Sequence, residues 1–407
     1  MAVNRTPLLE FSARENFRFN LQNTSPQAEQ TGRGGGHYYT SSQLFLNHAI
    51  LPNPGQFRVV REQAEIKCLN REDWPTGRYR GRRILFLLPS QALGSNVATL
   101  LFLTSFRRRH KPRAMGVFCA RSASDIYLSD KKIRVYNLWI GRKDLKSWDV
   151  VIDLGHLESR RNVDIWPVDM EAELLSAFAL PPCEEDYPSA ARPLNTAKPH
   201  IGIFPLATSP LRTLPFAATI AMARSLCDLG PVSIYLNRDQ GQGKAYLQAL
   251  RGKLAENVNI IEGLPSIGAL MAAVRDIDYG VFADSGPAHM SKLFATPGTA
   301  IYTSAPGDIL QGRFTNLRRW SVPYKGEHCQ APCGLAKLRQ SRDGRIGCMG
   351  SLECSLDDLP QVPSGSHGDI ARRLLENPVP CVRLLAERPE DATAFIRGDL
   401  EARLQGR

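Results

Sequence analysis

The segment Asp278-Tyr-Gly-Val-Phe-Ala-Asp-Ser-Gly-Pro-Ala-His-Met290 joins a short apolar run to a helix start. Its first half is typical of a buried strand, and Pro287 suits the first turn of a helix. Ser285 and Gly286 would then present backbone N–H groups at the positive end of that helix, an arrangement that binds phosphate. The alternative is an ordinary helix start capped by Asp284 or Ser285.

Similar strand-and-helix alternation extends upstream of this segment. Strands are expected at 201–204, 232–236 and 257–261, and helices at 215–229, 243–254 and 267–275. An earlier region repeats the plan, with strands at 84–88, 114–119, 133–138 and 150–154 and a helix at 96–109. Because strands alternate with helices, the sequence predicts an α/β fold made of two tandem Rossmann-like domains that face a cleft.

Composition limits the classes of protein that this chain resembles. Its 407 residues, 43% of them apolar, are enough for two domains with large cores. The sequence has no run of eighteen apolar residues and its start lacks a secretory signal pattern, which predicts a cytoplasmic protein whose nine cysteines stay reduced. A net charge of +11 predicts an anionic partner.

Changes in composition suggest where the domains begin and end. We expect an N-terminal extension over 1–80, partly disordered or forming a small β cap, and a first Rossmann-like domain over 81–190. The proline-rich stretch 184–199 is a predicted linker. A second Rossmann-like domain is expected over 195–375, with a cysteine-rich loop at 329–354, followed by a helical C-terminal segment over 376–407.

Four stretches between Arg82 and Leu359 resemble a known family. In chain order they are the strand, Ala-Leu-Gly turn and helix of 84–109, Trp148-Asp-Val-Val-Ile-Asp-Leu-Gly155, Gly263-Leu-Pro-Ser-Ile-Gly-Ala-Leu270, and Asp284-Ser-Gly-Pro-Ala-His289. The chain is similar in these stretches to the lipopolysaccharide heptosyltransferases, glycosyltransferase family nine. That resemblance implies a GT-B fold and transfer of a sugar from a nucleotide donor.

The resemblance also implies roles for individual residues. In the family, the loop matched by Asp284, Ser285, Gly286 and Ala288 holds the diphosphate and sugar of the donor, with His289 alongside; the alternative for His289 is a helix histidine satisfied by a backbone carbonyl. A basic residue follows the first strand of the family's donor domain, and Arg212 stands at that place, after Thr208 and Ser209. Arg212 would neutralise charge on the departing diphosphate, or it is simply an exposed loop arginine.

One position departs from the family pattern. The family has an aspartate after the first turn's glycine, placed to deprotonate the acceptor, whereas this chain reads Gly94-Ser95-Asn96 on the acceptor side. A serine hydroxyl cannot act as that base, so assistance of about 10²- to 10⁴-fold would be missing. Another carboxylate such as Glu158 or Asp164 could replace it, the acceptor could differ, or the chain could bind without turnover. Ser95 could also be only the N-cap of its helix.

Four cysteines fall close together as Cys329-x3-Cys333-x14-Cys348-x5-Cys354. Clustered thiols in a reducing compartment favour a structural zinc or iron site, although free buried thiols are the alternative. A cysteine-bound metal is known in this region of related autotransporter heptosyltransferases. The family needs no metal for catalysis, so an ion here would hold a loop in place.

The basic run Arg107-Arg-Arg-His-Lys-Pro-Arg113, with Arg78, Arg80, Arg82 and Arg83 nearby, could hold an anionic membrane or a phosphorylated glycolipid. A solvated helix end explains part of it equally well. No nucleic-acid module is present. Taken with this basic run, the family resemblance implies an inverting glycosyltransferase that transfers a sugar from an ADP-heptose-like donor to an anionic glycolipid or saccharide, in peripheral contact with the inner membrane. The alternatives are a non-catalytic nucleotide-sugar-binding or scaffold protein and a protein O-glycosyltransferase.

Overall fold

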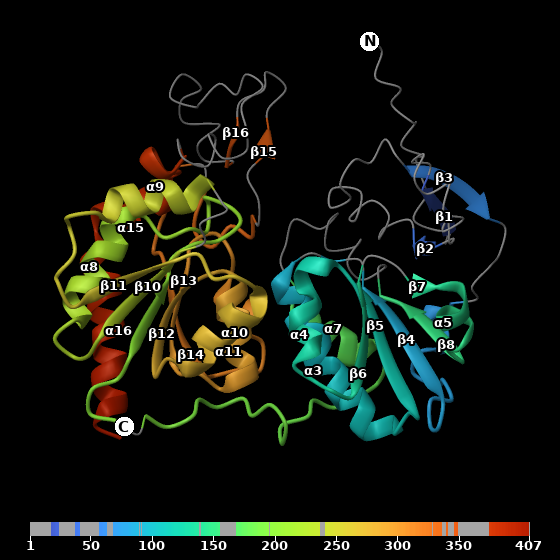
Figure 1. Cartoon of the computed structure of the whole chain (residues 1–407). Coiled ribbons are helices and arrows are strands. Elements are labelled where there is room, and N and C mark those ends of the chain that lie inside the picture. Colours follow the sequence, from blue (N-terminus) through green and yellow to red (C-terminus); the bar gives the residue numbers. More distant parts are fainter. Residues whose placement is uncertain are drawn as a thin grey trace, which may run out of the picture. The chain divides into compact units, whose positions relative to one another are not determined.

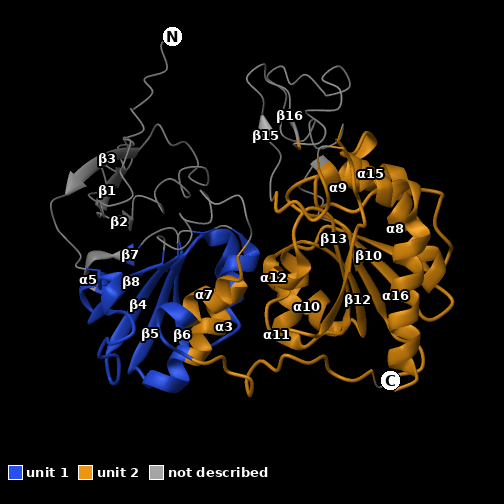
Figure 2. Ribbon diagram, turned by 180° about the vertical axis from the view of Figure 1, so that it is seen from behind, with its two compact units in different colours: residues 1–96, 106–163, 176–180 blue, residues 97–105, 164–175, 181–407 orange. Residues whose placement is uncertain are grey.

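The computed structural model describes residues 18–23, 37–40, 57–62, 68–88, 90, 92–137, 140–154, 168–194, 196–236, 241–327, 329–335, 339–340, 346–348 and 374–406. The chain divides into two compact units, shown in Figure 2. Unit 1 comprises residues 1–96, 106–163 and 176–180, and unit 2 comprises 97–105, 164–175 and 181–407. Cys354 and the two candidate bases Glu158 and Asp164 lie outside the described residues.

Unit 1 contains a four-stranded parallel sheet in the order β6-β5-β4-β8. Its strands are β4 (Arg83–Leu88), β5 (Ala114–Cys119), β6 (Ile133–Asn137) and β8 (Val150–Asp153). Strands β4 and β5 are buried along most of their length, which explains why they appear in the sequence as continuous apolar runs. Beside them lie α3 (Leu93–His110), η3 (Arg121–Ala123), α4 (Ser124–Leu128) and α5 (Arg142–Lys146).

Helix α3 begins three residues earlier than the sequence predicted. The predicted start at Asn96 is wrong because Ala92 is the N-cap and both Gly94 and Ser95 are helical. The interpretation of Ser95 as an N-cap is therefore wrong too. Aromatic rings hold this layer together: Phe106 on α3 packs edge-on against Phe86 on β4, Phe178 and Tyr79.

A second sheet in this part of the chain is antiparallel, in the order β3-β1-β2-β7. Its strands are β1 (Arg18–Asn23), β2 (His37–Thr40), β3 (Phe57–Glu62) and β7 (Ile140–Gly141). In the sequence, the short helix η2 (Arg71–Asp73) lies between β3 and β4. The three strands upstream of the parallel sheet thus belong to unit 1, and β2 pairs with β7 of the same unit.

Unit 2 contains a six-stranded parallel sheet in the order β11-β10-β9-β12-β13-β14 (Figure 1). Its strands are β9 (Ile201–Phe204), β10 (Val232–Leu236), β11 (Val258–Glu262), β12 (Tyr279–Ala283), β13 (Gly298–Tyr302) and β14 (Leu317–Ser321). The predicted strands 201–204 and 232–236 are confirmed with their ends. The order reverses between β9 and β12, the place where α/β sheets bind ligands.

Helices cover both faces of this sheet, with α8 and α16 on one face and α10 and α11 on the other (Figure 1). The helices along this part of the chain are α8 (Phe216–Leu226), α9 (Gly241–Leu250), α10 (Ile267–Asp276), α11 (Gly286–Phe294), α12 (Gly307–Gln311), α15 (Pro380–Glu387) and α16 (Pro389–Leu404). Helix α7 (Met170–Ala177) precedes them in the sequence and is not one of the helices on this sheet. A short pair, β15 (Arg339–Gln340) and β16 (Ile346–Gly347), completes the described elements. One core joins strand residues such as Ile203 and Val281 to Leu226 and Ile396.

The predicted linker 184–199 lies along unit 2. Its Arg192 donates through the guanidinium to the carbonyl of Arg275 at 2.7 Å, and its backbone N–H donates to the Ala295 carbonyl at 2.8 Å. Within the described part of the chain, no helix combines the length and the apolar character needed to cross a bilayer.

Candidate sugar-donor site

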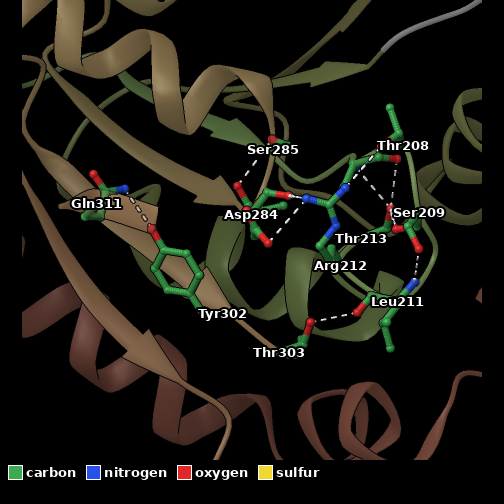
Figure 3. A network of polar contacts seen from close by, with 12 residues as sticks. Thr208, Ser209, Leu211, Arg212, Thr213, Asp284, Ser285, Tyr302, Thr303 and Gln311 are labelled. Atoms are coloured by element: carbon green, nitrogen blue, oxygen red, sulfur yellow. Dashed lines mark hydrogen bonds and ion pairs between the residues drawn. The ribbon is translucent and has the colours of Figure 1, made fainter. Parts of the chain in front are cut away.

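Two loops of unit 2 meet at the carboxyl edge of its sheet. One follows β9 and carries Thr208 to Thr213, and the other follows β12 and carries Asp284 and Ser285. Since β9 and β12 are parallel neighbours with Val281 opposite Ile203, both chains leave the sheet at the same edge. Figure 3 shows that the Arg212 guanidinium points from the first loop toward Asp284.

Arg212 is held loosely by the protein. Its Nη1 lies 3.3 Å from the Asp284 carbonyl oxygen and 3.4 Å from Asp284 Oδ2, and its Nη2 donates to Thr208 Oγ1 at 3.2 Å. These bonds are long for charge-assisted pairs. The Nε–H is buried and has no hydrogen-bond partner among the described residues. The guanidinium therefore keeps hydrogen-bonding capacity for an anion that reaches it.

The start of α11 is also open. Ser285 is its N-cap, but the Ser285 hydroxyl donates to the Ala283 carbonyl at 3.2 Å and does not accept from the helix. The first turn has no acidic side chain. The leading N–H groups of a helix have no intrahelical partner, and the Ser285 side chain does not cap them, so the positive end of α11 beside Arg212 can bind an anion. The prediction of a strand, turn and helix start at this segment is confirmed.

Buried hydroxyls brace the Arg212 loop. Thr303, just beyond β13, donates to the Leu211 carbonyl at 2.7 Å. Thr213 Oγ1 donates to Gln242 Oε1 at 2.9 Å and accepts from the Ala207 N–H at 3.1 Å. The Arg212 N–H itself donates to the Ser209 carbonyl at 3.0 Å, which closes the turn. These bonds fix the backbone that carries the guanidinium (Figure 3).

Stacked aromatic rings lie on the strands that lead into the two loops. Phe204 ends β9 and Phe282 lies near the end of β12, and their rings stack with centroids 5.1 Å apart. Tyr235 on β10 stacks on the other face of Phe204 at 4.5 Å. Room for the rings comes from Gly280, where a Cβ atom would lie 2.2 Å from the Phe282 ring. The rigid stack holds the ends of β9 and β12 in register.

The structure brings several of the predicted sugar-donor residues together. Thr208, Arg212 and Asp284 are in direct contact. Ser209 and Ser285 are buried in the two loops, and Ala288 and the partly buried His289 lie in the first turns of α11 after Gly286. Sequence reasoning missed Thr303, Thr213 and Gln242. The end of β13 was the available signal for Thr303, because every parallel strand ends at the same edge.

Lys292 on α11 is a buried cation that the sequence reading did not single out. Its ammonium donates to the Leu310 carbonyl at 2.7 Å and lies 5.2 Å from the centre of the Phe314 ring. Burial lowers its pKa to about 8, against the opposing influence of nearby carboxylates, among them Asp169 and Glu171. Burial in turn raises the pKa of Glu171, which accepts from Arg313 at 3.1 Å.

The predicted acceptor-side residues lie in unit 1 in the first turn of α3. Gly94 is partly buried, and Ser95 and Asn96 are fully buried. The Asn96 amide donates to the carbonyls of Ser90 at 3.0 Å and Ala92 at 2.9 Å, and its oxygen accepts from Tyr127 at 2.9 Å. Asn96 is thus a structural brace of this turn, and Ser95 is covered by protein.

Three of the four predicted metal-binding cysteines line one cavity of about 20 Å³, namely Cys329, Cys333 and Cys348. The fourth thiol lining it is Cys381 on α15, and the same cavity is lined by Leu211, the residue before Arg212. Burial, followed by the neighbouring thiols, raises the pKa of Cys381 to about 12. In the described residues no group of three or more His, Cys, Asp or Glu side chains is arranged to hold a metal ion.

A second cavity, of about 320 Å³, lies beside the carboxyl ends of β10 and β11. It is lined by Leu236 and Glu262 from the strands and by Gly243, Lys244, Leu247 and Arg251 from α9. After β11 the chain turns at Gly263, whose φ of +69° favours glycine. Helix α10 then starts at the N-cap Ser266, which accepts from the Ala269 N–H at 3.1 Å.

No protein-family model matches the sequence, and no curated protein matches it. Among solved structures, it is similar to the *E. coli* ADP-heptose lps heptosyltransferase II, with 16% identity over 63% of this chain and 95% of that chain and a TM-score of 0.44. It is also similar to the iron-containing dodecameric glycosyltransferase TibC from enterotoxigenic *E. coli*, with 14% identity over 93% and 90% of the two chains and a TM-score of 0.47. It is similar as well to a family 9 glycosyl transferase from Veillonella parvula, with 13% identity over 60% of this chain and 87% of that chain and a TM-score of 0.46. Heptosyltransferases are thus among its structural neighbours, at identities and TM-scores that do not assign a function.

Proposed function

We propose that this chain is a glycosyltransferase of the heptosyltransferase type, with a GT-B fold, that binds a nucleotide-diphosphate sugar in unit 2. The observation that carries the proposal is that two neighbouring groups both have free hydrogen-bond donors for an anion. The buried Nε–H of Arg212 lacks a partner among the described residues, and the α11 start beside it has no side-chain cap. A diphosphate supplies acceptor oxygens for both at once.

Each sugar-donor residue has a chemical task in this proposal. The diphosphate lies against the N–H groups of Ser285, Gly286 and Ala288, and Arg212 neutralises the negative charge that builds on the leaving group. Asp284, almost fully buried, orients the guanidinium and accepts from sugar hydroxyls. Thr208 and Ser209 form one side of the diphosphate site, and His289 lies on the next turn of α11. The cavity of about 320 Å³ at the same sheet edge has room for part of the nucleoside.

The acceptor step is an inverting displacement, in which a hydroxyl attacks the anomeric carbon opposite the leaving diphosphate. We propose an anionic cell-envelope saccharide or glycolipid as the acceptor, reached at the cytoplasmic face. Ser95 is 0% exposed and carries a hydroxyl without useful proton affinity, so the base is a carboxylate elsewhere in the chain. Glu158 and Asp164 remain the candidates that the sequence offers.

Ser95 also supports a second candidate function. A chain that keeps the diphosphate seat but has a buried serine where the resembled family has its base could bind nucleotide sugars as a scaffold without transferring them. A protein O-glycosyltransferase uses the same sugar-donor chemistry with a different acceptor. The three proposals share the seat and differ in turnover and acceptor.

A structural zinc or iron ion is the cofactor that the cysteines suggest. Four thiols lining one small cavity are the donor set that tetrahedral zinc and iron prefer, so the residues fit in type and number, although their present arrangement does not hold an ion. Cys329, Cys333, Cys348 and Cys381 would hold it, and it would tie α15 to the loop behind Leu211. Elemental analysis of purified protein should find about one ion per chain, lost in Cys381→Ser and kept in Cys227→Ser.

The function is tested by calorimetric titration with ADP, ADP-heptose and UDP-sugars, with AMP and adenosine for comparison. We expect diphosphates to bind at least tenfold more tightly than AMP, and Arg212→Gln to remove that difference. Transfer to lipopolysaccharide core saccharides or to protein acceptors, followed by mass spectrometry, separates the enzyme from the scaffold. Equal binding of ADP and adenosine would overturn the proposed diphosphate seat.

A further inference from the structure

Most of the chain's excess positive charge lies in three short stretches of unit 1. Residues 78–83, 107–113 and 128–132 hold eleven Lys and Arg residues and one acidic residue, Asp130, in a chain whose net charge is +11. Nine of the eleven cations are exposed. They are Arg78, Arg80, Arg82, Arg108, Arg109, Lys111, Arg113, Lys131 and Lys132. We call these three stretches the amino-edge surface.

The three stretches meet at one edge of a sheet. They directly precede β4, β5 and β6, which are parallel neighbours, so all three lie at the amino ends of the strands. The Gly81 N–H donates to the Lys111 carbonyl at 3.2 Å, and the Arg113 N–H donates to the Arg82 carbonyl at 2.8 Å. The third stretch is joined by the ion pair of Arg107 with Asp130.

This surface has few carboxylates to neutralise it. Asp130 already forms an ion pair with Arg107. The exposed Asp149 accepts a hydrogen bond from the Arg83 N–H at 2.8 Å. Eight of the nine exposed cations, all except Arg108, form no ion pair with another described residue. A concentration of unpaired charge of this kind costs folding energy through self-repulsion, so an anionic partner that relieves it is favoured.

One apolar side chain protrudes from the same surface. Leu128 is 60% exposed, and among the described residues it is the large hydrophobic side chain that stands out as exposed. In the sequence it precedes Lys131 and Lys132 by three and four residues. Cations around a protruding leucine match the interface of a lipid bilayer, where headgroups are anionic and the acyl boundary accepts an apolar side chain.

Nucleic acid is a poorer fit for the amino-edge surface. Binding of single strands relies on exposed aromatic rings for base stacking. The aromatic residues of this region, Trp74, Tyr79, Phe106 and Trp148, are at most 7% exposed. They are committed to the core of unit 1.

We propose that the amino-edge surface docks unit 1 on an anionic phospholipid bilayer, with Leu128 entering the interface and the surrounding Lys and Arg contacting phosphate headgroups. The surface uses no residue of the sugar-donor site. The proposal therefore stands or falls independently of the proposed catalytic function.

The test is co-sedimentation of the full chain with vesicles of phosphatidylcholine alone or with phosphatidylglycerol added. We expect binding only to the anionic vesicles, weakening as salt rises because exposed charges are screened. A fourfold variant removes charge from the surface: Arg109→Gln, Lys111→Gln, Lys131→Gln and Lys132→Gln. At roughly fivefold per cation, the loss of four cations should weaken binding by about six hundredfold. Leu128→Ser should bind roughly fivefold more weakly.

A matched control removes the same charge from exposed positions of unit 2: Lys198→Gln, Lys253→Gln, Lys325→Gln and Arg388→Gln. It should bind anionic vesicles within a fewfold of the unmodified chain. Far-UV circular dichroism and thermal unfolding show that each variant is folded. Equal loss in the control, unchanged binding of the surface variant, or wild-type binding to both vesicle types would overturn the proposal. So would tight binding of an RNA oligonucleotide that is insensitive to Leu128→Ser.

Discussion

The same local plan occurs twice, and its two helix starts differ in what they leave available. In unit 1, β4 leads into α3, and the turn is filled by the Asn96 side chain, which forms three hydrogen bonds to Ser90, Ala92 and Tyr127. In unit 2, β12 leads into α11, whose N-cap Ser285 does not cap the helix. A turn that satisfies its own polar groups is structural, whereas one that leaves them unmet beside a cation can bind an anion.

Replacing the brace in the closed turn should give the largest effect on stability. Asn96→Ala removes two buried hydrogen bonds and one partly buried one and leaves their partners unsatisfied, so we expect a loss of about 3 kcal/mol. Urea unfolding followed by circular dichroism measures it. Ser285→Ala in the open turn removes a single bond to the Ala283 carbonyl and should cost less than about 1 kcal/mol. Equal losses in the two variants would contradict the contrast.

Helix α11, whose first turn is open, also carries the buried ammonium of Lys292. This ammonium should make the free energy of unfolding depend on pH. Burial lowers the pKa of Lys292 to about 8. Between that value and the ordinary lysine pKa near 10.5, the unfolded chain binds a proton that the folded chain does not, so stability rises with pH across this window.

Unfolding of the wild type and of Lys292→Met should be compared between about pH 8 and 10. The difference in unfolding free energy between the two should shift with pH by about 2 kcal/mol in favour of the wild type at the alkaline end. Lys244→Met, at an exposed lysine of α9, is the control and should show no such shift. A flat difference for Lys292→Met would mean that the surrounding carboxylates keep the ammonium charged.

The cation beside the open start should affect ligand binding more than folding. Arg212→Gln removes a charge-assisted contact to the diphosphate, which we expect to weaken ADP binding by about 2 kcal/mol, roughly thirtyfold, with stability changed by less than about 0.5 kcal/mol. Arg212→Lys should fall between the two because lysine keeps the charge without the planar fork. Calorimetry measures the affinities. Arg224→Gln, whose guanidinium donates to the Lys253 carbonyl, should bind like the wild type.

The sequence predicted the turn before α11 correctly but not the turn before α3. The apolar run before Asp284 and the proline after it fix the strand and the helix start, because burial and a missing N–H act locally. The start of α3 was misplaced because the turn before it has no Ser, Thr or Asp cap and is closed by Asn96 from inside the helix. That bond depends on the rotamer of a buried side chain, which no spacing rule encodes.

Long-range partners account for the remaining differences. Cys381 lines the cavity of the earlier cysteines only because α15 returns to the Arg212 loop, and more than thirty residues separate it from Cys348. Similarly, Thr303, just beyond the end of β13, contacts Leu211 although the two residues are ninety-two positions apart in the chain. Sequence patterns predict which elements form. They do not predict which side chains from distant elements meet.

The smallest expected effect tests whether the Arg212 loop is held in place from outside. Thr303→Val keeps the shape of the side chain but removes the donor to the Leu211 carbonyl, at a cost of about 1 kcal/mol in stability. If this bond preorganises the loop, ADP affinity should also fall by roughly threefold, since part of the binding energy then orders the loop. Thr299→Val, on β13 itself, removes a similar buried bond, to Tyr279, with no link to the loop. It should match the stability loss and leave ADP affinity unchanged, so equal affinities for the two variants would show that the loop holds its shape without Thr303.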